Sequence, residues 1–289
     1  MLLLFAIPYF VLLIVIEVIC DRIYRLNNYE WRDSVSSVFM GFASLFINAI
    51  PHTITYPLFQ YLTRYRVFDV QPTILSYLVL LLLYDFSFYW SHRVSHRCRL
   101  LWASHVVHHS SEKFVLTTAL RQSWTDAIFN TMFYLYLPII GYPLSMIVVV
   151  RAINLVYQFW IHTEFKISLG FLDYVFNVPE YHSIHHSSNQ EYLGKKLTFI
   201  KSKSNCVDKT DCNYGGMFVL FDRIFGTFTE NKSIRIVYGI TTPIDTYNPL
   251  KIAFHEWIDM IKDCYDALSK REWRNAFLYV FAPPGWKPT

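Results

Sequence analysis

The chain has 289 residues, of which 53% are hydrophobic and 18% aromatic, and its formal net charge at pH 7 is +4. A positive mean hydropathy of +0.24 and several long apolar runs argue against a soluble enzyme. The net charge is mild, and the local basic residues do not indicate a nucleic-acid partner, because they are interleaved with candidate metal ligands beside apolar segments.

Four apolar segments are long enough to span a membrane, because a spanning helix needs about 18 apolar residues or more. They are Leu2–Ile19, Ser34–Leu62, Thr73–Trp90 and Asp126–Ile161. These segments predict an all-α fold, an integral membrane helical bundle. Met1–Cys20 has no basic start and no clear small-x-small cleavage site, so a retained helix is favoured over a signal peptide. Residues 34–62 are either one kinked span or a span with a re-entrant piece.

Nine of the eleven histidines lie between residues 92 and 186. They form an H-x3-H pair, two H-x2-H-H triads and one outlier: His92 and His96; His105, His108 and His109; His182, His185 and His186; and His162. Positions three and four apart share one face of a helix, so each set is expected to point one way.

Neutral imidazole is a common metal ligand and suits iron, zinc, copper and nickel. Eight or nine imidazoles exceed the three or four ligands of one ordinary site, so two metal ions are predicted. A set of ordinary buried or surface histidines is the competing interpretation. A His-lined metal transporter is the non-enzyme alternative, but it would place its ligands within spans near the midplane. Here the clusters follow the ends of apolar segments.

Shared metals would require all the clusters to lie on one side of the bilayer. Residues 126–161 must then enter the membrane and return, with the turn at Pro138–Pro143. Five basic residues accompany the first two clusters and place them on the cytoplasmic side by the positive-inside rule: Arg93, Arg97, Arg99, Lys113 and Arg121.

The rest of the chain is less informative. Residues 195–212 are polar and predicted to form a mobile loop. None of the five cysteines forms a C-x2-C pair, so no disulfide framework is expected. Residues 250–279 look helical and amphipathic, with Trp257, Met260 and Ile261 on one face, and either lie on the membrane or cap the catalytic domain. The predicted units are 1–72, N-terminal membrane helices; 73–230, the catalytic domain; and 231–289, a cytosolic or membrane-surface segment.

The histidine pattern resembles the fatty acid hydroxylase/sterol desaturase superfamily of membrane non-haem di-iron oxygenases. The histidine sets identify only the superfamily. Several stretches match the alkylglycerol monooxygenases: Trp102–Gln122, Tyr157–Glu164, Asn177–His186, Asn213–Phe228, Val237–Pro243 and the closing Pro284-Gly285-Trp286. Two of them, the ALRQ sequence at 119–122 and Tyr157–Glu164, narrow the resemblance to this group.

The resemblance implies O2-dependent hydroxylation of the carbon next to the ether oxygen of an alkylglycerol, with release of an aldehyde. It implies two iron ions, and tetrahydrobiopterin, the reductant of the animal enzyme, is a candidate reductant. Sterol desaturation and acyl-chain hydroxylation are the rival activities. The expected location is the endoplasmic reticulum membrane in a eukaryote or the inner membrane in a bacterium, and the electron donor is left open.

All eight clustered histidines are the predicted catalytic metal ligands, with His162 as the ninth. Four carboxylates are candidates for orienting them: Asp85, Glu112, Glu164 and Glu180. Buried carboxylates often accept the second N–H of a ligating imidazole, but helix packing or capping explains each of the four equally well. Arg121 and Gln122 are expected either to contact a lipid head group or to support the histidines.

Overall fold

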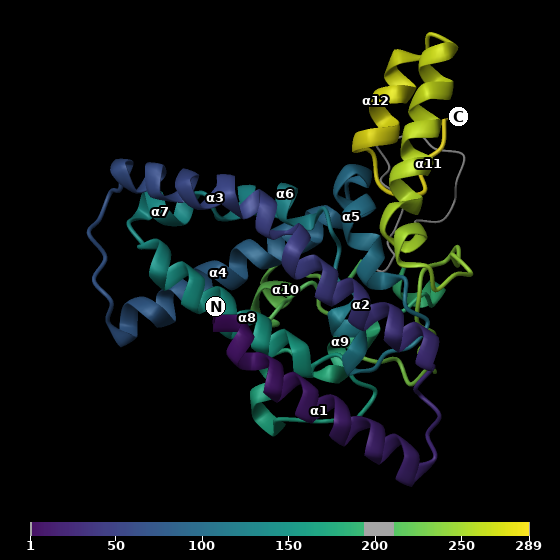
Figure 1. Ribbon diagram of the computed structural model, residues 1–289, viewed down its shortest axis with the longest axis horizontal. Coiled ribbons are helices and arrows are strands. Elements are labelled where there is room, and N and C mark those ends of the chain that lie inside the picture. The colour runs from purple at the N-terminus through teal and green to yellow at the C-terminus, as the bar shows by residue number, and fades with distance from the viewer. Residues whose placement is uncertain (1, 194–210, 289) are drawn as a thin grey trace.

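The computed structural model describes residues 2–193 and 211–288 (Figure 1). Within those residues every regular element is a helix, and strand-like pairing is limited to two isolated bridges, Phe176 with Phe218 and Ser187 with Tyr238. The predicted all-helical class is therefore confirmed. That this bundle sits in a membrane stays a prediction.

The α-helices are α1 Leu2–Tyr24, α2 Trp31–Ile47, α3 Ala49–Leu62, α4 Ile74–Ser95, α5 Arg99–His109, α6 Asp126–Asn130, α7 Tyr136–Ile140, α8 Leu144–Trp160, α9 Pro179–His185, α10 Leu220–Ile224, α11 Pro249–Ser269 and α12 Trp273–Phe281. The 3-10 turns are Thr63–Tyr65, Leu116–Leu120, Thr131–Tyr134, Gly170–Tyr174 and Gln190–Tyr192.

Helix α4 is the central apolar element. The Thr73 side chain caps its first turn through the backbone N–H of Ser76. Among the described residues α4 is the one unbroken helix long and apolar enough to cross a membrane. Helices α2 and α3, with the turn that follows α3, pass the same test together but bend by 45°. The structure therefore shows a bent pair in segment 34–62, and both membrane interpretations of it stay open.

The apolar segment after residue 126 folds back on itself. Helix α7 ends at Gly141, whose φ of +124° is a conformation that glycine adopts readily. A Cβ there would lie 2.1 Å from the carbonyl oxygen of Phe68, so the close approach also requires glycine. Helix α8 then runs back toward the histidines, and the predicted turn at Pro138–Pro143 is confirmed.

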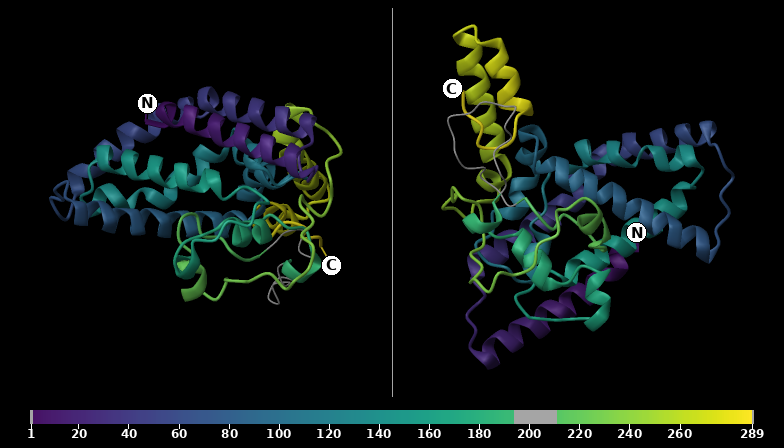
Figure 2. Two further views of the ribbon diagram at one scale, coloured as in Figure 1. Left: turned by 90° about the horizontal axis from the view of Figure 1, so that it is seen from below. Right: turned by 180° about the vertical axis from the view of Figure 1, so that it is seen from behind.

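The main apolar core lies where α3, α4, α7 and α8 meet. Its fully buried members include Leu80 of α4, Leu137 of α7 and Met146 of α8. This packing fixes α4 beside α8, so the C-terminal ends of the two helices, which carry or precede His92, His96 and His162, lie close together. Viewed from below, the apolar helices form a flattened layer with the 211–240 segment on one side of it (Figure 2).

The C-terminal helices α11 and α12 form a hairpin that projects from the rest of the molecule (Figure 1). Arg99 at the start of α5 anchors the hairpin through ion pairs of 2.6 Å to Glu256 and to Asp263. The expectation that Met260 and Ile261 share a face with Trp257 is wrong in one respect. Met260 is buried, whereas Ile261 is 63% exposed, because adjacent helical positions lie about 100° apart.

The described cysteines, Cys20, Cys98, Cys212 and Cys264, are free thiols. Cys206 and most of the loop predicted over residues 195–212 lie outside the described residues.

Candidate metal centre

The first two histidine sets are brought together by a sharp turn between α4 and α5. His92 lies in the last turn of α4 and His96 caps its end. Only Arg97 and Cys98 separate that cap from α5, so α5 packs back against α4. His105 and His109, four residues apart on α5, therefore face His92 and His96.

The third set arrives on α9, a two-turn helix with Pro179 at its first position. Proline is favoured there because its missing N–H would be unpaired in any case. Helix α9 carries His182 and His185, and His186 follows as its cap.

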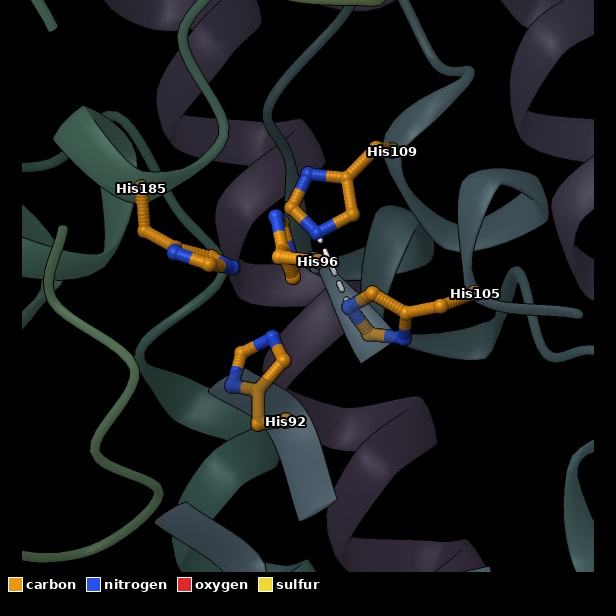
Figure 3. A group of neighbouring side chains, drawn as sticks. All are labelled: His92, His96, His105, His109 and His185. Atoms are coloured by element: carbon orange, nitrogen blue, oxygen red, sulfur yellow. Dashed lines mark hydrogen bonds between the residues drawn. The ribbon is translucent and has the colours of Figure 1, made fainter. Parts of the chain in front are cut away.

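Five histidines converge in one group: His92, His96, His105, His109 and His185 (Figure 3). One ring nitrogen from each lies within 4.8 Å of all the others. The Nε2 atoms of His105 and His109 are 3.0 Å apart. All five side chains are buried except that of His105, which is half-buried. We call this the five-histidine group.

A second group holds the remaining four, His108, His162, His182 and His186. Its Nε2 atoms form a chain of short contacts, 3.1 Å from His108 to His162, 2.9 Å from His162 to His182 and 3.2 Å from His182 to His186. We call this the four-histidine group. His162, the outlier in sequence, lies directly after α8 and belongs to it.

The triads are split between the groups, which corrects the expectation that each triad points one way. His105 and His109 enter the five-histidine group and His108 the four-histidine group; His185 leaves its triad in the same manner. The two groups adjoin, since the rings of His109 and His186 stack with centroids 4.3 Å apart. Consecutive helical residues diverge by about 100°, so an H-x2-H-H sequence can serve two neighbouring sites.

The donor geometry fits metal ions. Imidazole nitrogens bind such ions at about 2.0–2.1 Å, and two nitrogens on one ion at or a little above a right angle are then about 3 Å apart. The contacts within the four-histidine group match this spacing. In the five-histidine group the Nε2 atoms of His92 and His185 are buried without a hydrogen bond to any described residue. A buried unpaired nitrogen is costly unless it meets a ligand.

Burial also keeps the rings in the neutral form that metals require. It lowers the pKa of His108 from its usual 6.5 to about 4, and it lowers the pKa values of His182 and His186 well below 6.5. Neighbouring imidazoles act in the same direction for His182 and His186. At neutral pH these three rings carry lone pairs.

Backbone carbonyls orient three of the rings. The Nδ1 atoms of His92 and His185 each lie 2.8 Å from a carbonyl oxygen, that of Tyr214 and that of Cys212. The Nδ1 atom of His162 lies 2.7 Å from the carbonyl oxygen of Gln158. A carbonyl can only accept, so Nδ1 donates and Nε2 is left with its lone pair facing the other histidines.

None of the four candidate carboxylates makes a hydrogen bond to a described imidazole. Asp85 is fully buried and accepts from Asn154 and from the backbone N–H groups of Met217 and Phe218. Glu112, Glu164 and Glu180 have exposed side chains. Asp85 therefore fastens the 217–218 segment to α4 and α8.

The question left open for Arg121 is answered by its contacts. Its guanidinium is 2% exposed and pairs with Asp33 of α2 at 2.8 Å, while Nε donates to the Ser110 hydroxyl at 2.9 Å. Arg121 thus ties α2 to the residue that follows His109 and supports the histidines. The Gln122 amide donates to the carbonyl oxygen of Ala119 at 2.6 Å.

Sequence reasoning missed the 211–228 segment as a support of the centre. Tyr214 contributes its carbonyl to His92, and its ring packs against His92, His96 and His185. Asp222 is fully buried and accepts from the backbone N–H groups of Tyr214 and Gly215. The available signal was an acidic residue inside the apolar run 217–225, shortly after two consecutive glycines.

Comparison with known proteins defines the class. A family model described as fatty acid hydroxylase matches residues 77–227, which contain all nine histidines of the two groups. The chain belongs to the fatty acid hydroxylase family, and the predicted family is confirmed.

Several relatives carry one name. The chain is 33% identical to human alkylglycerol monooxygenase and 31% identical to that of Xenopus tropicalis; each alignment covers 98% of this chain and 59% of the relative. The alkylglycerol monooxygenase of Danio rerio is 37% identical over 71% of this chain and 41% of that protein. The chain thus spans about three fifths of the human and Xenopus proteins. No solved structure matches it.

Proposed function

We propose that this protein is a membrane non-haem di-iron monooxygenase that hydroxylates the carbon next to the ether oxygen of alkylglycerols. The observation that carries the proposal is the pair of adjoining histidine groups, nine buried or half-buried imidazoles in a five-and-four arrangement. The names of the relatives add the substrate class.

The proposed ligands are the five-histidine group for one ion and the four-histidine group for the other. When bound, two iron ions would supply the O2 activation and C–H cleavage that no amino-acid side chain performs. The overall reaction consumes O2 and two electrons from a reductant, with tetrahydrobiopterin proposed for that role. The hydroxylated carbon is a hemiacetal, which breaks down to an aldehyde and glycerol.

The chain's own residues hold the centre in the form this chemistry needs. The carbonyls of Tyr214, Cys212 and Gln158 fix the tautomers of three rings. Phe114 is fully buried and lies with its ring centroid 5.1 Å from that of His186. Aromatic packing of this kind keeps water away from the four-histidine group and preserves neutral imidazole.

A lipid-facing location is supported by the exposed apolar surface of the first four helices. Leu75 and Leu78 of α4 are 70% and 55% exposed, and Phe42 of α2 is 61% exposed. Soluble proteins rarely expose large contiguous apolar patches. Both histidine groups lie beyond the last apolar turns of α4 and α8, where a lipid head group meets water. We propose the cytoplasmic side for this end, in the endoplasmic reticulum or the bacterial inner membrane.

The test is aldehyde release from an alkylglycerol by membranes containing the iron-loaded protein, with tetrahydrobiopterin added or withheld. Pterin-dependent aldehyde is the expected result. Absence of aldehyde from protein that holds two irons per chain would overturn the substrate assignment. Lipid profiling would then look for a hydroxylated sterol or acyl chain. Hydroxylation of another lipid class is a reasonable alternative, because one relative, 26% identical over 55% of this chain, is named ornithine lipid hydroxylase OlsE, from Rhizobium tropici.

A further inference from the structure

One short segment, residues 212–218, lies against the five-histidine group and is held there by two buried carboxylates. Asp222 at the start of α10 and Asp85 in α4 are each fully buried. Both accept backbone N–H groups of this segment: Tyr214 and Gly215 donate to Asp222, and Met217 and Phe218 donate to Asp85. The two carboxylates differ in one respect. It is the group that donates to the carbonyl oxygen of each peptide unit whose N–H the carboxylate accepts.

The peptide group between Tyr214 and Gly215 connects Asp222 to a histidine. Its N–H, on Gly215, donates to Oδ2 of Asp222 at 2.7 Å. Its C=O, on Tyr214, accepts from Nδ1 of His92 at 2.8 Å. A peptide group is conjugated, so a negative charge beside its N–H pushes electron density toward its carbonyl oxygen. The carbonyl oxygen becomes a stronger acceptor for the imidazole.

The backbone at this point is shaped for the contact. A Cβ at Gly215 would lie 2.2 Å from the carbonyl oxygen of Phe218 and 2.9 Å from Oδ2 of Asp222. The segment therefore needs glycine at 215 to bring its N–H onto the carboxylate. The Thr227 hydroxyl donates to the other oxygen of Asp222 at 2.7 Å and fixes the carboxylate.

We propose that Asp222 is a positioning residue for the five-histidine group: through the 214–215 peptide it fixes the tautomer of His92 and strengthens that ring as a metal ligand. The inference rests on the proposed two-metal centre. The Nε2 atom of His92, opposite the anchored Nδ1, is buried and free of any hydrogen bond to a described residue. A group that orients a ligating histidine typically contributes about 10- to 100-fold to metal affinity.

Asp85 supplies a matched control within the same segment. The two peptide groups that donate to Asp85 contain the carbonyls of Gly216 and Met217, and both carbonyls accept from Asn177. Neither carbonyl reaches an imidazole. Asp85 therefore shares with Asp222 its full burial and its pair of backbone donors, but neither of its two peptide groups connects it to a histidine of the five-histidine group.

The experiment compares Asp222→Asn with Asp85→Asn. An asparagine keeps the size of the side chain but removes the charge and turns one acceptor into a donor in both positions. Metal-stripped full-length protein in detergent is titrated with cobalt(II) against a competing chelator, and the visible absorption of each bound ion is followed. Thermal unfolding of the metal-free variants measures the loss of fold stability separately.

We expect wild type and Asp85→Asn to hold two ions with similar affinity. Asp222→Asn should lose about 10- to 100-fold in affinity for one ion, with a change in that ion's absorption, and keep the other. Equal losses in both variants, or none in either, would overturn the role of Asp222. A wild type that binds fewer than two ions would instead overturn the proposed centre.

If Asp222→Asn does not fold, Asp222→Glu replaces it. The glutamate keeps the charge but carries one extra methylene in a site where Gly215 already allows little room. We expect a smaller fall in affinity, confined to the same ion. Unchanged binding of both ions by the folded glutamate variant would equally overturn the proposal.

Discussion

The two histidine groups adjoin, yet they are supported by different parts of the chain. In the five-histidine group, His92 and His185 donate to carbonyls of residues 212–214, a segment held in turn by Asp222. In the four-histidine group, His162 donates within its own turn to Gln158, and Phe114 packs against the rings of three members. One group depends on a distant hydrogen-bonded segment, the other on a helix end and aromatic packing.

The difference means that substitutions can separate the groups. A hydrogen-bonded support fixes the orientation of an imidazole ring, because a ring that loses its acceptor can rotate or change tautomer. A packed support acts through volume, because a smaller side chain leaves space into which the rings or water can move. Metal content measured separately for the two groups distinguishes these two kinds of support.

The largest expected effect is that of His108→Ala. The Nε2 atom of His108 lies 3.1 Å from that of His162, and the substitution removes a proposed ligand of the four-histidine group. Activity should be abolished and one of two bound ions lost, with the other ion retained. His255→Gln, which alters a histidine of α11 outside both groups, is the control and should keep both ions. Normal turnover by the His108 variant would contradict the ligand assignment.

Acid should destabilise the metal-free protein by way of the same histidines. Burial lowers the pKa of His108 to about 4, below the value of 6.5 that it has when unfolded. Between these two values the unfolded chain binds the proton and the folded chain does not. Stability is therefore full above pH 6.5 and falls as the pH drops toward 4. His182 and His186 shift in the same direction and add to the loss.

Urea midpoints measured between pH 7.5 and 4.5 check this prediction. Bound metal should enlarge the effect, because protons compete with the ion for the same nitrogens. A midpoint that is constant or rises as the pH falls would contradict the burial of neutral rings.

Asp33→Asn should weaken both groups together. Asp33 and Arg121 form a buried ion pair at 2.8 Å, and Arg121 also holds Ser110, which directly follows ligands of both groups. Leaving a buried guanidinium without its carboxylate costs about 3–5 kcal/mol. Thermal unfolding should report a loss of this order, and both ions should be released at a lower chelator concentration. Release of one ion alone would show that Arg121 serves a single group.

Much of the centre was predictable because the ligands occur at helical spacings. The H-x3-H pair at 92 and 96 and the return of the apolar hairpin to His162 follow from periodicity and from the Pro138–Pro143 turn. The division into five and four was not predictable. It depends on how α5 and α9 are rotated against each other, and a one-dimensional pattern contains no information on that rotation.

The supports of the ligands were harder to predict for a related reason. Proximity in sequence suggested Glu112 and Glu180, which are exposed, whereas the observed acceptors are backbone carbonyls. Two of them lie 27 and 122 residues from their histidines, and the third, that of Gln158, lies four residues before His162. Every residue has a carbonyl, so residue type gives no indication of which one is used. Asp222 was detectable only as a carboxylate within an apolar run.

The smallest effect, and the one that tests the packed support, is expected from Phe114→Leu. The Phe114 ring lies 5.7 Å from His162, 6.1 Å from His182 and 5.1 Å from His186 by ring centroid, and it stacks on Tyr238 at 5.0 Å. Leucine keeps an apolar side chain but gives up the stacking, worth about 0.5–1.5 kcal/mol per aromatic pair. Cobalt affinity should therefore fall several-fold for the four-histidine group and stay unchanged for the five-histidine group. If Phe114→Leu instead lowers both affinities equally, the two groups share one support, and the distinction between directional and packed support is wrong.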